Sequence, residues 1–287
     1  MHTDRSLFAI LAEVEHSHPF SMRQLTGMMT RVEQSIRVRS DAGDTVMNRS
    51  RSLCFLAVVL LIRAFNSMPV HGEELDNALS AAEKKDGWIL LFDGKSQDGW
   101  QVSSGHFNKD PVEEGCLNPH GAGGYMLVQK KTWADFVLSL DFKISKGCNS
   151  GIFIRTYPLT PRPGKDVGFN GIEVAIDDTK TAGFHDTGAF YDLVKPSKNV
   201  MKLPGQWNHM VISCDGPKLA VELNGKRINE TDLDQWTTPN RRPDGSEHKF
   251  DIAYKNHPRF GFIGLQDHGS ACWYKNIKIK PLGSSKH

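Results

Sequence analysis

The sequence lacks the features of several protein classes. No apolar run reaches the ~20 residues that a membrane-spanning helix needs, so no membrane span is expected. The formal net charge is only +2, and no stripe of Lys and Arg with interleaved aromatic residues occurs, which argues against a nucleic-acid partner. The five cysteines include no CxxC pair, so a zinc site is not expected. Internal repeats and low-complexity tracts are also absent.

The longest apolar run, Leu53 to Ile62, has the surroundings of a secretory signal peptide. Arg49 and Arg51 precede it, and small residues follow it up to Gly72. This order of basic, apolar and small residues is typical of a signal peptide, whereas a buried core helix is the alternative. We therefore expect residues 47–72 to be a signal peptide and the protein to be exported, either periplasmic or extracellular.

A signal peptide acts at the start of a chain, so Met47 is the expected initiator. Residues 1–46 would then be a mis-annotated upstream extension, with a genuine long leader as the alternative. Residues 73–85 are polar and helix-prone, and we expect a linker or short helix there. The main domain is expected over 86–283, followed by a tail at 284–287.

Four cysteines remain after the predicted leader. They are widely spaced, and four cysteines allow three disulfide pairings. Buried free thiols are slightly favoured over disulfides. The residues are Cys116, Cys148, Cys214 and Cys272.

From Trp88 onward, short apolar or alternating runs recur, each followed by turn residues. No amphipathic helix separates them, and this spacing is typical of an all-β sandwich or barrel. Asn224-Gly225 between two such runs is a strong hairpin signal. We predict a jelly-roll β-sandwich. The longest irregular stretch, 229–259, is expected to be a functional loop or a disordered one.

One predicted strand carries a candidate catalytic carboxylate. Residues 171–178 read GIEVAIDD. Successive side chains of a strand point to opposite faces, so the aliphatic residues share one face and Glu173, Ala175 and Asp177 share the other. That second face is either solvated or the floor of a cleft, and a carboxylate in a cleft could act on a bound ligand.

Two further segments offer polar residues at strand ends. The segment NSGIFIR ends in Arg155, and GFIGLQDHG places Gln266 and His268 on one face of a strand. A surface cation and a structural histidine are the simpler interpretations of Arg155 and His268.

Eight segments in order resemble one known family. They are LFDGKSQDGW, NSGIFIR, IEVAIDD, TGAFYDLVKP, GQWNHMVI, ELNGKRI, GFIGLQDHG and WYKNIKIKPL, and they span about residues 86–283. The chain resembles the domain of unknown function 1080 (DUF1080) family, described as 3-keto-glycoside lyase/hydratases or 3-keto-disaccharide hydrolases. The resemblance implies a concanavalin A-like lectin/glucanase fold, in agreement with the strand pattern.

The resemblance also implies a reaction on a small carbohydrate. A separate glycoside 3-oxidoreductase, the implied pathway partner, converts the C3 hydroxyl of a sugar to a ketone. A base then removes the acidified C2 proton, the C1 oxygen leaves, and water adds to the enone. By this resemblance Glu173 is the candidate base, His268 an acid or second base, and Arg155 the group that binds the enolate.

The resemblance suggests further site residues. The candidate substrate-binding side chains are Asn149, Tyr191, Gln266 and Lys275. No cofactor is required, but Asp177 and Asp178 could hold a divalent cation such as Ca²⁺ through oxygen ligands. Two positions depart from the family pattern, since Ala175 replaces a common glutamine and Lys275 a common arginine.

Two other functions stay open at this point. A retaining glucanase needs two carboxylates about 5–5.5 Å apart, but residue 175 is alanine and Asp177 lies ~13 Å along the strand. A carboxylate from another strand could still complete that pair. A non-catalytic lectin-like module would instead use aromatic platforms, for which Tyr191, Trp207 and Trp273 are available.

Overall fold

The computed structural model describes residues 75–283. The predicted upstream extension, signal peptide and C-terminal tail lie outside the described residues and stay predictions. Within 75–283, no helix combines the length and the apolar character that crossing a bilayer requires.

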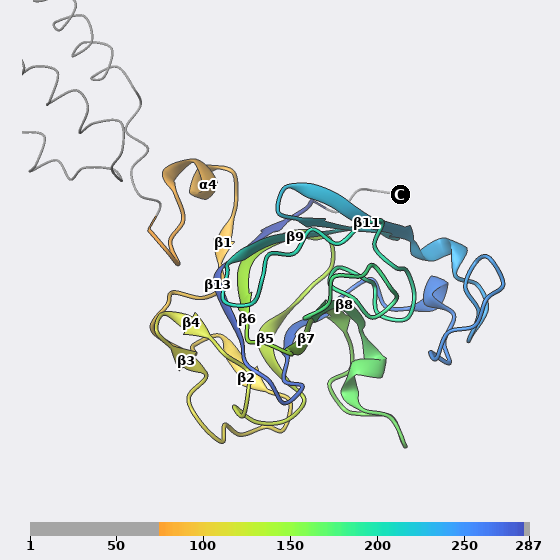
Figure 1. Ribbon diagram of the computed structural model, residues 1–287, viewed down its shortest axis with the longest axis horizontal. Helices are drawn as coiled ribbons and strands as arrows, with labels where there is room; N and C mark the ends of the chain where they lie inside the picture. The colour runs from red at the N-terminus through yellow and green to blue at the C-terminus, as the bar shows by residue number, and fades with distance from the viewer. Residues whose placement is uncertain (1–74, 284–287) are drawn as a thin grey trace, which may run out of the picture. The chain divides into compact units, whose positions relative to one another are not determined.

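The described chain forms two antiparallel β-sheets (Figure 1). The larger sheet has the order β11-β10-β9-β6-β13-β4-β3, with β1 paired to β13, and the smaller has the order β2-β5-β12-β7-β8. The strands of the larger sheet are β1 (Ile89–Leu90), β3 (Val112–Glu113), β4 (Cys116–Leu117), β6 (Phe136–Ile144), β9 (Asn208–Asp215), β10 (Lys218–Leu223), β11 (Lys226–Asp232) and β13 (Cys272–Pro281). Those of the smaller sheet are β2 (Trp100–Val102), β5 (Met126–Trp133), β7 (Asn149–Thr156), β8 (Ile172–Asp177) and β12 (Gly261–Gln266).

Helical structure is confined to short pieces in the described residues. They are α4 (Ala81–Lys85) and the 3₁₀ turns η1 (Val167–Asn170), η2 (Leu233–Gln235) and η3 (Tyr254–Asn256). The prediction of an all-β, jelly-roll-like sandwich of the concanavalin A-like type is therefore confirmed.

The core lies between the two sheets and explains which faces the strands bury. Ile152, Val174 and Leu265 of the smaller sheet join one apolar cluster with Leu138 and Ile212 of the larger sheet. Because side chains alternate along a strand, the residues between them in sequence point away from this core. The outer face of the smaller sheet is thus left free to carry Glu173, as the alternation predicts.

The hairpin signal at Asn224-Gly225 is confirmed. These two residues connect β10 to β11, where Leu223 pairs with Lys226. Both have positive φ, 50° and 72°, which is the backbone of a type I′ turn and favours Asn-Gly over other pairs.

The segment expected as a linker or short helix contains α4 and is attached to β13. Ser80 caps α4 through a capping box with Glu83. Asn77 and Asn276 exchange two bonds, each donating its backbone N–H to the side-chain oxygen of the other. Lys278 also pairs with Glu83, so this segment is part of the folded unit.

The long segment after β11 is ordered by its own aromatic packing. Trp236, Phe250 and Tyr254 are buried, and the ring centroids of Phe250 and Tyr254 lie 5.7 Å apart in an edge arrangement. The three side chains also belong to the main apolar core cluster, which holds residues 248–252 against the rest of the fold. The stretch is also shorter than expected, because β11 continues to Asp232.

All four cysteines of the described part are buried free thiols, as the sequence slightly favours.

Candidate active site

Glu173 lies on the outer face of β8, and its side chain leans over the neighbouring strand. It is opposite Phe153 of β7. A Cβ added at Gly151 would lie only 2.6 Å from the Glu173 Oε1 atom. The missing side chain of Gly151 therefore makes the space that the Glu173 carboxyl occupies.

A narrow crevice surrounds this carboxyl. It has a volume of about 20 Å³, which is room for about one water molecule. Two strands, the η1 region and the segment after β11 contribute its walls. Besides Glu173, the lining residues are Tyr125, Phe153, Asp166, Gly168, Phe169, Tyr191, Lys249 and Phe250.

The Glu173 carboxyl is nearly buried and has no hydrogen-bond or ion-pair partner among residues 75–283. Only 8% of the residue is exposed. Burial raises the pKa of Glu173 to about 8, the Asp166 carboxylate adds to this rise, and the Lys249 ammonium opposes it. Desolvation penalises the charged form, so an unpaired buried carboxyl keeps its proton to unusually high pH. Such a group can exchange a proton near neutral pH.

A lysine ammonium stands beside this carboxyl on aromatic surfaces. The Lys249 Nζ atom lies 4.2 Å from the centroid of the Tyr191 ring and 5.2 Å from that of Phe169. Cation–π contact stabilises a cation without neutralising it. No carboxylate of the described residues lies within ion-pair distance, so the charge of Lys249 is available to a ligand.

An arginine and an aspartate anchor the segment that carries Lys249. The Asp192 carboxylate accepts a bond from the Lys249 backbone N–H at 2.8 Å. The Arg242 guanidinium donates to the same carboxylate at 3.0 Å and to the Leu193 carbonyl at 3.1 Å. Residues 240–250 are therefore tied to the turn that follows Tyr191.

Tyr191 and Gln266, both predicted as substrate-binding, lie at or next to the crevice. The Tyr191 backbone N–H donates to the Glu173 carbonyl at 2.9 Å, which places its ring beside the carboxyl. The Gln266 amide donates to the Tyr125 hydroxyl at 2.8 Å, while its Oε1 atom is buried without a partner. Gln266 thus reaches the crevice through Tyr125.

Other predicted residues gather at the far end of the same strands. Asn149 pairs in register with Asp177. Burial, followed by the nearby carboxylates of Asp186 and Asp178, raises the pKa of Asp177, and His268 slightly opposes this rise. His268 is exposed. Asp178 accepts a bond from the Gly147 backbone N–H. None of these residues lines the crevice at Glu173.

The carboxylates at this strand end do not form a metal centre by themselves. No group of three or more His, Cys, Asp or Glu side chains within residues 75–283 is arranged to hold a metal ion. The cation site suggested by Asp177 and Asp178 stays a prediction.

Arg155 lies away from the crevice and is fully buried. Its guanidinium donates to the Gly216 carbonyl at 2.8 Å and to the Asp135 carboxylate at 3.0 Å. The positive φ of Arg155, 51°, interrupts the alternation of β7 and turns the side chain toward the larger sheet. The structure therefore does not bring Arg155 to Glu173.

Lys275 also lies elsewhere, on β13 of the larger sheet. Its ammonium pairs with Asp76 at 2.6 Å and lies 4.5 Å from the Trp207 ring centroid. Lys143 stacks between Trp207 and Trp273 on the same sheet. Of the three aromatic platforms considered for a lectin-like module, Trp207 and Trp273 are therefore not at Glu173, whereas Tyr191 lines the crevice.

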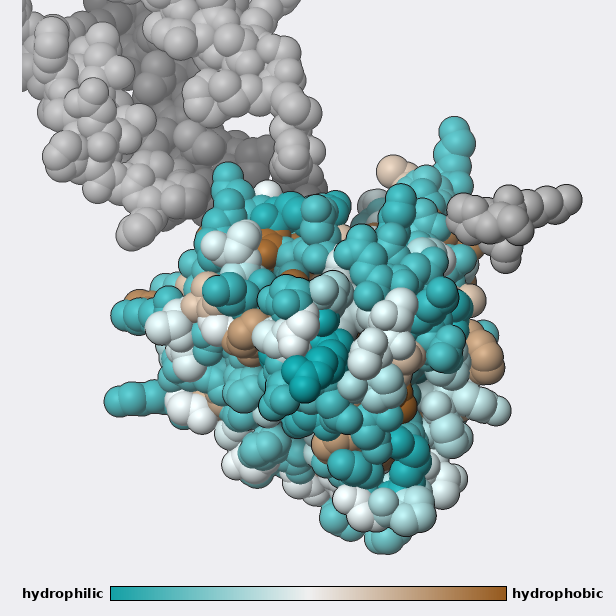
Figure 2. Space-filling model, turned by 90° about the vertical axis from the view of Figure 1, so that its right-hand side faces the viewer, coloured by the Kyte–Doolittle hydropathy of each residue, from teal (hydrophilic) through white to brown (hydrophobic). Residues whose placement is uncertain are grey.

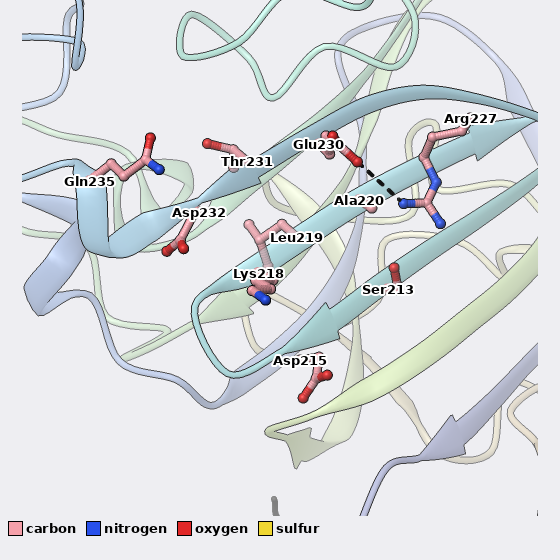
Figure 3. A pocket seen from close by; sticks show the side chains of 10 residues that line it. All are labelled: Ser213, Asp215, Lys218, Leu219, Ala220, Arg227, Glu230, Thr231, Asp232 and Gln235. Atoms are coloured by element: carbon pink, nitrogen blue, oxygen red, sulfur yellow. Dashed lines mark ion pairs between the residues drawn. The ribbon is translucent and has the colours of Figure 1, made fainter. Parts of the chain in front are cut away.

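A larger hollow, of about 490 Å³, lies on the outer face of β9, β10 and β11 (Figure 3). Arg227 in its wall is paired with Glu222 and Glu230. None of its lining side chains has a buried polar atom without a partner, and none is a nearly buried carboxyl. We therefore regard the smaller crevice at Glu173 as the chemical site.

Three polar side chains of the crevice are not predicted from the sequence: Tyr125, Asp166 and Lys249. Tyr125 precedes β5, Asp166 lies in the connection between β7 and β8, and Lys249 lies in the long segment after β11. The only available signal is that 229–259 is unusually long for a loop, which indicates a functional segment without naming a residue.

The protein is a two-sheet β-sandwich whose outer face carries a nearly buried carboxyl with a raised pKa. This combination indicates a candidate enzyme, and comparison with known proteins places the chain in a family. The chain belongs to the 3-keto-alpha-glucoside-1,2-lyase-like domain family, whose sequence profile matches residues 87–280. The resemblance to the DUF1080 family is thereby confirmed, and membership indicates an enzyme that acts on carbohydrates.

Individual relatives agree with this assignment. The chain is 28% identical over 254 residues to the 3-keto-disaccharide hydrolase of Bacteroides thetaiotaomicron, which covers 75% of this chain and 85% of the relative. A solved structure from Parabacteroides distasonis, provisionally assigned as a glycosyl hydrolase, is 32% identical with a TM-score of 0.59 and covers 68% of this chain and 99% of its own. A second from that organism, assigned likewise, is 26% identical with a TM-score of 0.60, covering 73% and 100%.

Replacing Gly151 by alanine should displace the Glu173 carboxyl. The added methyl group would overlap Oε1, and overpacking of this kind costs about 1–3 kcal/mol. Thermal unfolding and a crystal structure of Gly151→Ala measure the two effects. Gly264→Ala is the control, because its methyl group would overlap the buried Met126 side chain instead of Glu173. An unmoved Glu173 side chain in Gly151→Ala would contradict this account.

Arg155→Met should lower the free energy of unfolding by about 3 kcal/mol, because it leaves the Asp135 carboxylate and the carbonyl groups of Ala134 and Gly216 without their buried partner. Denaturant unfolding measures the change. The control is Arg241→Met, whose exposed pair with Glu247 should contribute less than about 1 kcal/mol. Equal stability losses in the two variants would show that Arg155 is not a structural ion pair.

Proposed function

We propose that this protein cleaves 3-keto-glycosides by eliminating the C1 substituent after removal of the C2 proton, and then adds water to the product. The observation that carries the proposal is the nearly buried, unpaired carboxyl of Glu173. Family membership supports the substrate class. The name of the Bacteroides relative supports a disaccharide as the substrate.

In the proposed reaction, the Glu173 carboxylate takes the proton from C2. The electrons of the C2–H bond form a C2–C3 double bond, and negative charge develops on the C3 oxygen. That charge returns to expel the C1 oxygen, which leaves with a proton and produces an enone. Water then adds its oxygen to C1 and its proton to C2. The sum is hydrolysis of the glycoside, with no change in overall oxidation state.

Lys249, rather than Arg155, is the proposed partner of the enolate. A cation near the C3 oxygen would stabilise the charge that develops there, and such preorganised electrostatic contributions are among the largest in catalysis. Lys249 lines the crevice with Glu173 and has no carboxylate partner among the described residues. The guanidinium of Arg155 is already committed to Asp135 and Gly216.

The remaining predicted residues receive supporting roles. Tyr191 and the Tyr125–Gln266 pair would bind hydroxyl groups of the reacting sugar. Asn149 and His268 would bind hydroxyl groups at the far end of the strands. No redox cofactor is needed in this protein, because a separate 3-oxidoreductase would supply the ketone. Following the predicted signal peptide, we place the reaction in the periplasm or outside the cell.

Binding requires the crevice to open. Its volume of about 20 Å³ does not admit a sugar ring. Lys249 and Phe250 form one wall, and their segment is anchored by Asp192 and Arg242 rather than by strand pairing. We propose that this segment moves outward to admit the substrate and closes over it, which also excludes water from the proton transfer.

A second candidate function, direct glycoside hydrolysis, is favoured by one observation. Asp166 lines the same crevice as Glu173, so a second carboxylate comes from outside β8. A protonated Glu173 would be the acid and Asp166 the base or nucleophile, in the manner of two carboxyls with unlike environments. Asp166→Asn would then abolish cleavage, whereas the elimination needs no second carboxylate.

Release of the leaving group from a 3-keto-glucoside and from its unoxidised parent tests the proposal. We expect release from the 3-keto compound only, because only a C3 ketone acidifies the C2 proton. Glu173→Gln should lower turnover by at least about 10²-fold, the contribution of a positioned base, while substrate affinity is retained. Release from the parent at an equal or higher rate would establish direct hydrolysis. A protein that binds both sugars and cleaves neither would be a lectin-like module.

The pH dependence gives a second test, using kcat/KM for the 3-keto-glucoside. The base must be ionised, and burial holds the pKa of Glu173 at about 8, so activity should rise about tenfold per pH unit below that value and level off above it. A Glu173 that acts as an acid would give the opposite slope, with activity falling above about pH 8.

Lys249→Met should raise the apparent pKa of this profile and lower kcat by about 10²-fold, because the cation that favours the ionised carboxylate and the enolate is lost. Lys165→Met is the matched control, since the Lys165 ammonium lies 4.6 Å from the Phe169 ring centroid but does not line the crevice. An unshifted profile in Lys249→Met would remove Lys249 from the mechanism.

A further inference from the structure

We propose that a second hollow, next to the crevice on the other side of Phe169, is the subsite for a pyranose leaving group. The inference rests on the proposed function, because it assigns a binding site to the part of the substrate that departs from C1. It concerns different residues, however, and can be tested separately from the chemistry at Glu173.

The hollow has about 410 Å³, within the range of small-molecule sites, whereas the crevice at Glu173 has room for about one water molecule. Two chain segments line both spaces. In the first segment, the crevice is lined by residues 166, 168 and 169, and the hollow by residues 169 and 170. In the second segment, the crevice is lined by residues 249 and 250, and the hollow by residues 251 and 252. The two spaces therefore adjoin at the Phe169 ring.

An aromatic surface borders the hollow. The Tyr157 side chain is unusually accessible for an aromatic residue, with 44% of the residue exposed. Its ring is supported by Phe260, with centroids 4.9 Å apart, and by Phe262, with centroids 6.5 Å apart. An accessible aromatic ring with a hydroxyl at its edge suits the C–H face of a pyranose.

The polar side of the hollow offers paired donors and acceptors. The Arg162 guanidinium donates to the two Asp251 carboxylate oxygens at 2.8 and 3.3 Å and to the Asn170 side-chain oxygen at 3.2 Å. Both Arg162 and Asp251 keep more than a third of their side chains exposed. Their outward atoms could therefore exchange hydrogen bonds with the vicinal hydroxyl groups of a sugar.

The position of the hollow favours the leaving group over another ligand. In the proposed elimination the bonds that break are at C2 and at the adjacent C1, so the departing sugar must lie directly beside the ring whose C2 faces Glu173. This hollow adjoins the crevice. The larger hollow of Figure 3 lies on the other sheet and shares no residue with it. Figure 2 views the side that carries the segment after β11, which is mostly hydrophilic with small apolar patches.

The test compares kcat/KM for a 3-keto-disaccharide with that for methyl 3-keto-glucoside, whose leaving group is too small to reach the hollow. In Tyr157→Ala and Asp251→Asn we expect the ratio of the two values to fall about tenfold, the equivalent of one lost anchoring contact. Tyr157→Phe keeps the ring and should preserve most of the selectivity.

The possible outcomes separate the subsite from the chemistry. An unchanged ratio, whether or not both kcat/KM values fall, would overturn the subsite. If the unmodified protein cleaves neither compound, the proposed function fails, and the subsite is then judged by calorimetric titration with the unoxidised disaccharide. At least about tenfold weaker binding by Tyr157→Ala would support it, and equal or absent binding by both proteins would overturn it.

Discussion

The candidate site depends on the burial of one carboxyl group without a partner. Glu173 is placed on the outer face of β8 by alternation, over a glycine that leaves room for it. The aromatic and loop residues of the crevice then remove it from water. Burial of this kind costs free energy when the group is charged, so the group responds by holding its proton. The fold therefore produces a residue that can exchange protons near neutral pH, at the expense of local stability.

The loops determine which charges act on this carboxyl. The Asp192–Arg242 pair holds the segment that carries Lys249, and Asp166 caps the start of η1 through a bond from the Gly168 backbone N–H. One charge lowers the pKa of Glu173 and the other raises it. Movement of either segment would change the pKa, which couples opening of the site to the protonation of its base.

The sequence predicts the parts of this molecule that follow from local periodicity. The alternation of residues 171–178 places Glu173 correctly, and Asn224-Gly225 identifies the hairpin. Arg155 is different, because the positive φ at that residue breaks the alternation of β7, and one-residue irregularities of this kind are not visible in the residue pattern. Lys249 and Asp166 reach the site through long connections, whose paths depend on tertiary contacts such as the Asp192–Arg242 pair.

The central claim is that the Glu173 carboxyl is protonated at neutral pH because it is buried without a partner. The most direct measurement is the infrared carboxyl signal between pH 5 and 10, taken as the difference between the unmodified protein and Glu173→Gln. We predict a single protonated carboxyl that titrates at about pH 8. A Glu173 that is already ionised at pH 6 would contradict the account, because neither its burial nor its surroundings would then have the assigned effect.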